Sequence, residues 1–201
     1  MFKIIHDFIS KFHVTNWQAD ILVSFVFVAL FMMSVIIIGI ICNYLEQLQI
    51  RLVSKYVGQT FAIFIFNRVL FIGTVIHELS HAFFAWISGA KVTKVRCLTL
   101  FSKDTLGYCE FIPRGNIFVK SFQLAFASCA PTVTGCFILY LCSRYFTSFS
   151  SLGKVIIFYV GLSVLNHMSM SSQDVKNYIK GSICMYIIIF VFTMAYHHFY
   201  I

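Results

Sequence analysis

Charged residues are scarce in this chain of 201 residues: Asp, Glu, Lys and Arg make up 11% of it, whereas 60% is apolar. A soluble domain of this length carries roughly a quarter charged residues. A core surrounded by water cannot bury this much Phe, Ile and Val. The composition therefore excludes an ordinary soluble domain and indicates that the lipid bilayer is the solvent. The length allows one domain and leaves no room for a second folded module.

Acidic residues are scarcer than basic ones, with seven against fifteen, so the formal net charge is +8. In a soluble protein this balance would suggest a nucleic-acid partner. In a membrane protein, Lys and Arg at the membrane edges set the topology and meet anionic lipid instead. We therefore expect the bilayer as a partner, and no nucleic acid.

Close cysteine pairs of the CxxC kind are absent, and the seven cysteines are an odd number. Most lie in apolar runs, where cysteine behaves as a small hydrophobe. This pattern argues against a disulfide framework and against a cysteine zinc site. Cys97 and Cys109 could pair across a hairpin, but free thiols are the better prediction. We also expect no secretory signal, because the first long apolar run begins near residue 21 and is too long for one.

Long apolar runs are what the chain does have, and they predict an α-helical polytopic membrane protein with about five transmembrane helices. Residues 1–19 alternate apolar and polar residues at helical spacing, which predicts an amphipathic segment on the membrane surface. Residues 20–201 are expected to form a single transmembrane domain. We expect breaks between its later helices at Leu152–Gly153 and Lys180–Gly181. The expected spans are 21–44, 60–88, 117–142, 153–170 and 182–201.

Residues 89–116 differ in character from the spans on either side. One strand is expected over Val92–Leu100 and a returning strand over Tyr108–Ile112, joined by a turn at Ser102–Asp104. The sequence therefore predicts a small membrane-associated β-hairpin after the second span.

Basic residues favour one orientation of the five spans. With the amino terminus in the cytoplasm, the cytoplasmic side holds ten of them: Lys3, Lys11, Lys91, Lys94, Arg96, Lys103, Arg114, Lys120, Lys176 and Lys180. The opposite side holds four: Arg51, Lys55, Arg144 and Lys154. This asymmetry predicts a multi-pass protein, most simply of the cell membrane, whose active site opens toward the cytoplasm.

A motif with chemistry of its own lies inside the second expected span: His77-Glu78-Leu79-Ser80-His81. Positions i and i+4 of a helix lie one above the other, so His77 and His81 can bind one metal ion together. Glu78 is rotated from His77 by about 100° and can reach a water without being a ligand. Two histidine ligands and a glutamate general base are typical of a zinc metalloprotease, and the motif arises by chance in roughly one such chain in 300.

Ionisable groups within hydrocarbon need an explanation of their own. An unpaired charge at that depth costs at least about 2.5 kcal/mol. Three ionisable groups within five residues therefore predict one bound Zn²⁺ ion. The alternative is that both histidines are neutral and hydrogen-bonded within a helix bundle.

A catalytic zinc takes a third protein ligand and keeps an open position. Asp174 directly follows the fourth expected span, and the predicted topology puts the ends of spans two and four on the same side. We therefore predict Asp174 as the third ligand, with His167 in reserve; if the helix continues, the two share a face at i and i+7. The other acids belong to the expected surface helix, a loop or the hairpin, far from this site: Asp7, Asp20, Glu46, Asp104 and Glu110.

Four short motifs, in this order, resemble those of the site-2-protease-like family of intramembrane zinc metalloproteases. His77–Ala82 reads HELSHA and is similar to the HExxH of the family with its small following residue. Gly89-Ala-Lys-Val92 resembles its Gly-x-x-Val entry into a hairpin, and Ala127-Ser-Cys-Ala-Pro131 its Ala-Gly-Pro stretch. Asn166 and Asp174 keep the spacing of its last motif, although the prolines between them are missing and a valine replaces the Gly that follows the Asp.

The resemblance covers about residues 60–180 and implies a minimal member of the family, without a PDZ insertion, as a single metalloprotease domain. It implies Glu78 as the general base, Asn166 as a group that binds substrate or the oxyanion, and these zinc ligands: His77, His81 and Asp174.

The expected function is hydrolysis of a peptide bond in or near a transmembrane segment of a membrane protein or peptide substrate. The hairpin would hold the unwound substrate by strand addition. Two other classes stay open on the same residues, a metal-ion carrier and a catalytically silent membrane scaffold or chaperone. A regulatory membrane partner or an oligomer also stays open.

Overall fold

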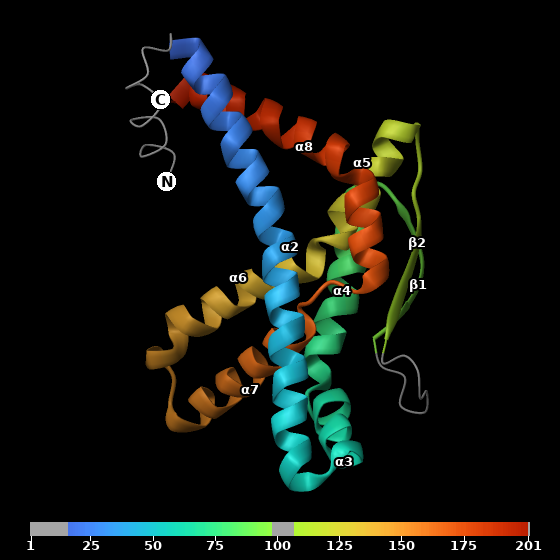
Figure 1. The fold of residues 1–201 in the computed structure, drawn as a ribbon, viewed down its shortest axis with the longest axis vertical. Coiled ribbons are helices and arrows are strands. Elements are labelled where there is room, and N and C mark those ends of the chain that lie inside the picture. Colours follow the sequence, from blue (N-terminus) through green and yellow to red (C-terminus); the bar gives the residue numbers. More distant parts are fainter. Residues whose placement is uncertain (1–15, 98–106, 201) are drawn as a thin grey trace.

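Helices make up most of this protein, and one two-stranded sheet accompanies them (Figure 1). The computed structural model describes residues 16–97 and 107–200. Most of the predicted surface segment 1–19 and the predicted turn at 102–104 therefore lie outside the described residues. Residues 16–19 belong to the first turn of the first described helix.

That helix, α2 (Asn16–Val57), has 42 residues and is much longer than the predicted span 21–44. At 1.5 Å per residue it is about 63 Å long, roughly twice the thickness of the hydrocarbon layer. Residues 45–57 contain neither proline nor glycine, so nothing interrupts the helix after its apolar part. It ends at Gly58, whose φ of 85° suits glycine best.

Among the described residues, two helices are long and apolar enough to cross a membrane, α2 and α8 (Ser172–Tyr200), or up to four if each of two bent helix pairs counts as one span. The fourth expected span, 153–170, corresponds to α7 (Ser151–His167), an apolar helix of 17 residues. Five spans are thus not confirmed. Large apolar side chains lie open on the outside of the helices, such as Ile183 at 73% exposure, which fits a surface covered by lipid.

The second expected span is a bent pair. It consists of α3 (Gln59–Phe64), a π-helical turn at Ile65–Val69 and α4 (Phe71–Ile87), with a bend of 52°. Helix α7 takes up the backbone carbonyls that the bend releases: the Tyr159 hydroxyl donates to the Val69 carbonyl and the Ser163 hydroxyl to that of Leu70, each at 2.5 Å. A helix break within a membrane is tolerated where neighbouring side chains satisfy the freed backbone in this way.

The third expected span is also bent, by 40°, between α5 (Ile117–Ser128) and α6 (Ala130–Tyr145). Pro131 stands just after the bend and has no N–H for the preceding turn. A short 3-10 turn (Phe146–Ser148) then leads to α7. The chain breaks at Phe149–Ser150, slightly before the predicted break at Leu152–Gly153, because α7 already begins at Ser151.

The predicted break at Lys180–Gly181 is wrong, because α8 runs through these residues. Gly181 serves the packing of α8 on α5 instead. A Cβ at this position would overlap the carbonyl oxygen of Ser121 and come within 2.7 Å of the Ala125 Cβ. The glycine is therefore needed for close approach of two helices rather than for a turn.

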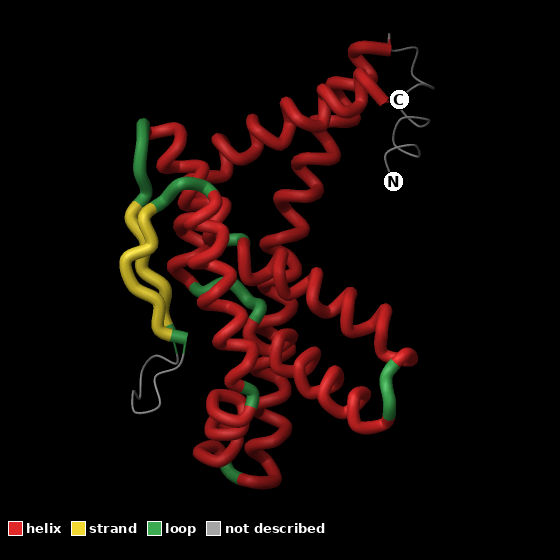
Figure 2. Tube along the Cα trace, turned by 180° about the vertical axis from the view of Figure 1, so that it is seen from behind, coloured by secondary structure: helices red, strands yellow, loops and turns green. Residues whose placement is uncertain are grey.

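The hairpin is present, with β1 (Lys91–Arg96) antiparallel to β2 (Tyr108–Ile112) and Val95 opposite Cys109. It lies beside α4 (Figure 2). Gln123 of α5 joins the two chain segments at the open end of the hairpin. Its side-chain oxygen accepts from the Arg114 N–H at 2.8 Å, after β2, and its amide donates to the Ser88 carbonyl at 2.8 Å, before β1. The seven cysteines are free thiols, as predicted.

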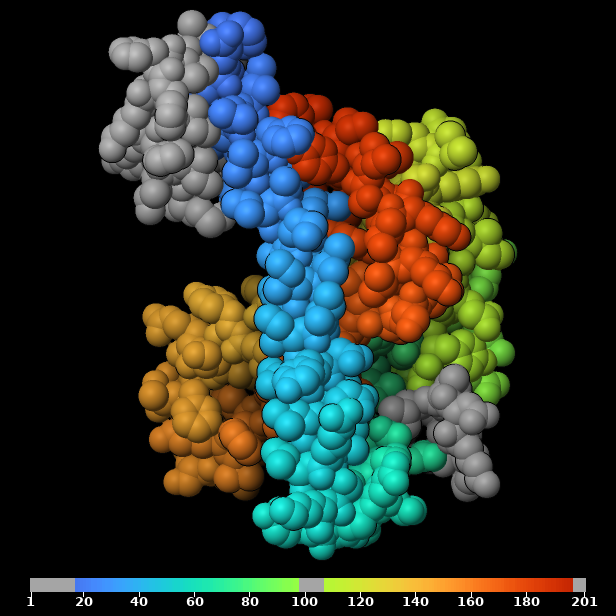
Figure 3. Space-filling view, in the orientation of Figure 1, coloured from blue at the N-terminus to red at the C-terminus, as the bar shows by residue number. Residues whose placement is uncertain are grey.

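Helix α2 runs along the length of the molecule, with the α6–α7 pair on one side and the hairpin on the other (Figure 3). Side chains of α2, α5, α8 and the adjoining links form the main buried apolar cluster. Its members are Val28, Met32, Val35, Ala125, Cys129, Met170, Tyr178 and Met185.

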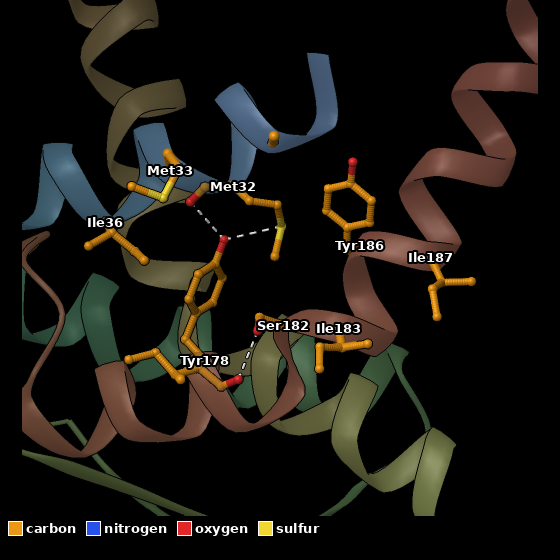
Figure 4. Close-up of a pocket in the computed structure, with 10 residues that line it drawn as sticks. Met32, Met33, Ile36, Tyr178, Ser182, Ile183, Tyr186 and Ile187 are labelled. Carbon is orange, nitrogen blue, oxygen red and sulfur yellow. Dashed lines mark hydrogen bonds between the residues drawn. The ribbon is translucent and has the colours of Figure 1, made fainter. Parts of the chain in front are cut away.

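An apolar hollow of about 360 Å³ opens between α2 and α8 (Figure 4). The hydroxyls on its wall are already engaged: Tyr178 donates to the Met32 carbonyl at 3.1 Å and Ser182 to the Ile179 carbonyl at 2.8 Å. The hollow therefore presents hydrocarbon, as expected of a surface that meets lipid chains.

Candidate metal centre

Three of the side chains predicted as ligands converge on one point near the middle of the molecule. His77 and His81 come from α4, and Asp174 comes from the first turn of α8. The two Nε2 atoms are 3.1 Å apart, and the His81 Nε2 lies 3.5 Å from the Asp174 Oδ2. One ligand atom from each residue lies within 4.8 Å of the other two, so the group could hold a metal ion.

The outer nitrogens of both histidines face backbone carbonyls. The His77 Nδ1 lies 2.6 Å from the His167 oxygen, and the His81 Nδ1 lies 2.8 Å from the Ala127 oxygen. A carbonyl oxygen only accepts hydrogen bonds, so each Nδ1 carries the proton. In the neutral rings both Nε2 atoms then present lone pairs to each other and to a carboxylate oxygen. A proton on one Nε2 or a metal ion held by all three atoms would stabilise this arrangement.

The carbonyl that orients His81 is available because of Pro131. In an uninterrupted helix the Ala127 carbonyl would accept from the N–H of residue 131, and proline has none. The freed carbonyl takes the His81 Nδ1–H instead. Hydrogen bonding of this kind fixes the tautomer and ring orientation of histidine ligands.

The carbonyl that orients His77 comes from the end of a helix. His167 is the last residue of α7, and the last carbonyls of a helix have no partner within it. His77 takes the carbonyl of His167, and the Thr132 hydroxyl of α6 takes that of Met168 at 3.0 Å. Helices α4 and α6 thus hold the end of α7 against the site.

Asp174 is held by the start of its own helix. The Ser171 N–H and hydroxyl both donate to the Asp174 Oδ2, at 3.0 and 2.5 Å. The Asp174 N–H lies 3.2 Å from the Ser171 Oγ in return, which is the reciprocal pattern of a capping box. The capping box therefore fixes the carboxylate that points toward His81.

The donor set and its spacing fit zinc. Tetrahedral zinc with bonds of about 2.0–2.1 Å keeps its ligand atoms about 3.3 Å apart. Two of the three separations, 3.1 and 3.5 Å, lie on either side of this value, and the third is no more than 4.8 Å, so one side chain has to move slightly to complete the site. Two neutral imidazoles and one carboxylate are also a ligand set that catalytic zinc uses.

A polar cavity of about 360 Å³ adjoins the site, and His77 is the candidate ligand that lines it. Glu78 lines it and is 8% exposed. Thr74 lies one turn before Glu78 on the same face of α4. Gly107 covers Glu78 from the hairpin side, where a Cβ would come within 2.8 Å of the Glu78 Cγ. The general base predicted from the motif is thus buried and faces the cavity.

Three buried polar atoms on the cavity wall have no hydrogen-bond partner: the Thr74 Oγ1, the Asn166 Oδ1 and the His167 Nε2. Asn166 is 2% exposed, and its amide group donates to the Leu162 carbonyl at 2.9 Å. Its oxygen is buried without a partner, and the substrate-binding role that the resemblance implies for Asn166 stays a prediction. Unpartnered buried acceptors need a ligand or water.

The reserve ligand, His167, lies apart from the metal group. The structure ends α7 at His167, so the condition for a shared face with Asp174 does not hold. The His167 Nδ1 lies 3.0 Å from the Ser163 carbonyl, and its Nε2 faces the cavity. The geometry thus favours Asp174 over His167 as the third ligand, which stays a prediction.

Glu46 and Asn43 of α2 also line the cavity, and the sequence placed Glu46 far from the site. That placement is wrong because α2 continues past its apolar part and passes beside the cavity. No local pattern around Glu46 indicates this neighbour, because the contact depends on how α2 packs. Thr74 could have been found from its spacing of four residues to Glu78.

Cys109 lies on β2, and its thiol has a strongly raised pKa. Burial, reinforced by the charge of Glu78, raises the pKa of Cys109 to about 12. In the absence of a metal ion the thiol is therefore protonated at neutral pH and is a poor nucleophile.

No protein-family model, curated protein or solved structure matches this chain. Its likeness to site-2 proteases, carried by the motifs between His77 and Asp174, stays a prediction.

Proposed function

We propose that this protein is an intramembrane zinc metalloprotease of the site-2-protease type, which hydrolyses a peptide bond in or near a transmembrane segment of another membrane protein. One observation carries the proposal: one ligand atom each from His77, His81 and Asp174 lies within 4.8 Å of the other two, and backbone carbonyls at both Nδ1 atoms leave the histidine Nε2 atoms for this point. A buried glutamate lines the cavity beside them.

The chemistry needs a Lewis acid and a base. When bound, zinc supplies the Lewis acid, which makes water a better nucleophile and polarises the scissile carbonyl. Glu78 takes the proton of the attacking water and later gives it to the leaving amine. Asn166 offers its unpartnered oxygen to the backbone N–H of a bound substrate.

The hairpin supports an extended substrate. A peptide bond inside a helix is shielded by the turns around it, so the substrate segment unwinds locally before its backbone reaches Glu78. In the described sheet each strand pairs on one side only, and an unwound segment can add to the free edge.

The membrane topology is part of the proposal. We keep the five-span arrangement with the amino terminus in the cytoplasm, in which ten basic residues face four and the site opens toward the cytoplasm. A metal-ion carrier is less well supported, because the described residues contain a single group of three potential ligands rather than a path of several. A silent scaffold has no use for a buried glutamate beside a metal group.

Replacement of Glu78 by Gln tests the proposal. The substitution keeps the volume of the side chain and removes the base, so zinc should stay bound while cleavage stops. Membrane peptides are compared by mass spectrometry between cells with the wild-type protein and cells with E78Q. We expect a set of peptides cut within or beside transmembrane segments to disappear in the variant. If the peptides are identical and E78Q still holds zinc, the protein is not a protease of this mechanism.

A further inference from the structure

The cavity beside Glu78 contains a second carboxylate, that of Glu46 on α2. The described residues that line the cavity include these two acids and no Lys or Arg, although the chain as a whole has a net charge of +8. Zinc at the neighbouring site would bring two positive charges, which Asp174 and Glu78 match. Glu46 is then the acid for which the described cavity wall supplies no opposite charge.

The unpartnered polar atoms on the same wall are mostly acceptors. The Asn166 oxygen accepts only, because an amide oxygen carries no proton. The His167 Nε2 also accepts, since its Nδ1 points to the Ser163 carbonyl and so carries the proton. Asn166 and Thr74, at 2% and 4% exposure, are both almost wholly buried, so bulk water does not satisfy them. A wall with unpaired acceptors and an unmatched carboxylate suits a positively charged group with several N–H donors.

The position of Glu46 indicates where such a group comes from. The charge-free run of α2 ends at Tyr44, and Glu46 lies about 3 Å further along the helix at 1.5 Å per residue. Glu46 is thus at the edge of the apolar part of α2. Lys and Arg near the ends of transmembrane segments reach along apolar surface and hold their charge at the interface.

We propose that Glu46 is a specificity-determining residue, and that the cavity selects substrates with a Lys or Arg side chain close to the scissile bond. The inference rests on the proposed protease function and names the class of its substrates: transmembrane segments cut near a basic end. Glu46 pairs with the basic side chain, while Thr74 and the Asn166 and His167 acceptors bind N–H groups of the same segment.

Binding of synthetic peptides tests the inference. The full-length E78Q protein, which binds but does not turn over, is placed in nanodiscs of uncharged lipid at fixed low salt. The fluorescent peptides share one Leu/Ala segment of about twenty residues and end in Lys-Lys, Gln-Gln or Glu-Glu. The Lys peptide should bind at least about tenfold more tightly than the Gln peptide, as expected for a charge-assisted contact in a partly buried site.

Variants of α2 then assign the preference to Glu46. With E46Q added, the ratio of Lys to Gln peptide affinity should fall below about threefold, and with E46K the Glu peptide should bind best. Gln47→Lys is the matched control, because it changes the net charge as E46Q does on an exposed neighbouring residue outside the cavity lining. It should keep the tenfold ratio. Zinc content checks that each variant is folded.

Equal affinity for the Lys and Gln peptides in the E78Q protein would overturn the inference. So would a loss of preference in Q47K as large as in E46Q, because the effect would then be one of overall charge. A Lys preference with no cleavage of any peptide by the wild-type protein would remove the protease function and leave the binding inference standing. Cleavage without preference would remove only the inference.

Discussion

His81 donates its Nδ1–H to the backbone carbonyl of Ala127, 2.8 Å away and 46 residues later in the chain. The carbonyl is free because Pro131 supplies no N–H to it. A proline in one helix thus fixes the tautomer of a histidine in another, and leaves the His81 Nε2 lone pair pointing at Asp174. The relationship explains how two motifs far apart in the sequence act on one site.

Pro131→Ala tests this relationship. The alanine restores an N–H that competes with His81 for the Ala127 carbonyl, so the histidine loses its fixed orientation. Loss of such a partner lowers metal affinity by about 10–100-fold. Competition with a zinc-binding dye on purified protein gives the affinity.

Pro113 provides the control for this substitution, because it is the only other proline and follows β2 in a loop. Pro113→Ala should leave the zinc affinity unchanged. If P131A also leaves it unchanged, the Ala127 carbonyl does not govern His81.

Asp174→Ala and His167→Ala distinguish the two candidates for the third ligand. Removal of the Asp174 carboxylate should weaken zinc binding by more than about 100-fold, since loss of a ligand costs more than loss of its hydrogen-bond partner. His167→Ala keeps the backbone carbonyl that accepts from His77 and should change zinc affinity by less than about threefold. The same dye competition measures both. The reverse order of effects would make His167 the ligand.

Gly73→Ala should separate α4 from α7. A Cβ at Gly73 would overlap the Ser163 carbonyl oxygen and come within 2.7 Å of the His167 Nδ1, and the Gly73 N–H donates to the Ser163 hydroxyl at 2.7 Å. We expect a loss of about 1–3 kcal/mol in the free energy of unfolding, as for other overpacked sites, together with lower zinc occupancy. Unfolding in detergent, followed by circular dichroism, measures the stability.

Gly161→Ala is the matched control on α7, where a Cβ would lie 3.8 Å from the Leu139 Cδ2, an ordinary contact. Its effect should stay within about 0.5 kcal/mol. Equal effects of the two substitutions would show that the close approach at Gly73 does not hold the helices together.

The sequence predicts the parts of the site that depend on local spacing. His77 and His81 share a face because four residues separate them on a helix. The hairpin strands also follow from local pattern, with β2 at the predicted residues and β1 beginning one residue before the prediction. Each of these depends on residues close together in the chain.

What the sequence misses depends on contacts between distant helices. The bend before α4 has no proline at it, and α7 stabilises it through Tyr159 and Ser163. Gly181 looks like a break from its neighbours and is a packing residue because of Ser121. Glu46 reaches the cavity only because α2 continues beyond its apolar part and passes beside it. Neither propensity nor periodicity contains this information.

The zinc content of the purified wild-type protein tests the central claim most directly, because the proposed mechanism depends on one ion held by His77, His81 and Asp174. The protein is extracted in detergent without chelators, and zinc is measured per chain by mass spectrometry of the metal. The structure predicts about one zinc per chain, held with the strength of a protein zinc site. Less than about half an equivalent under these conditions would contradict the metal centre and the protease mechanism that depends on it.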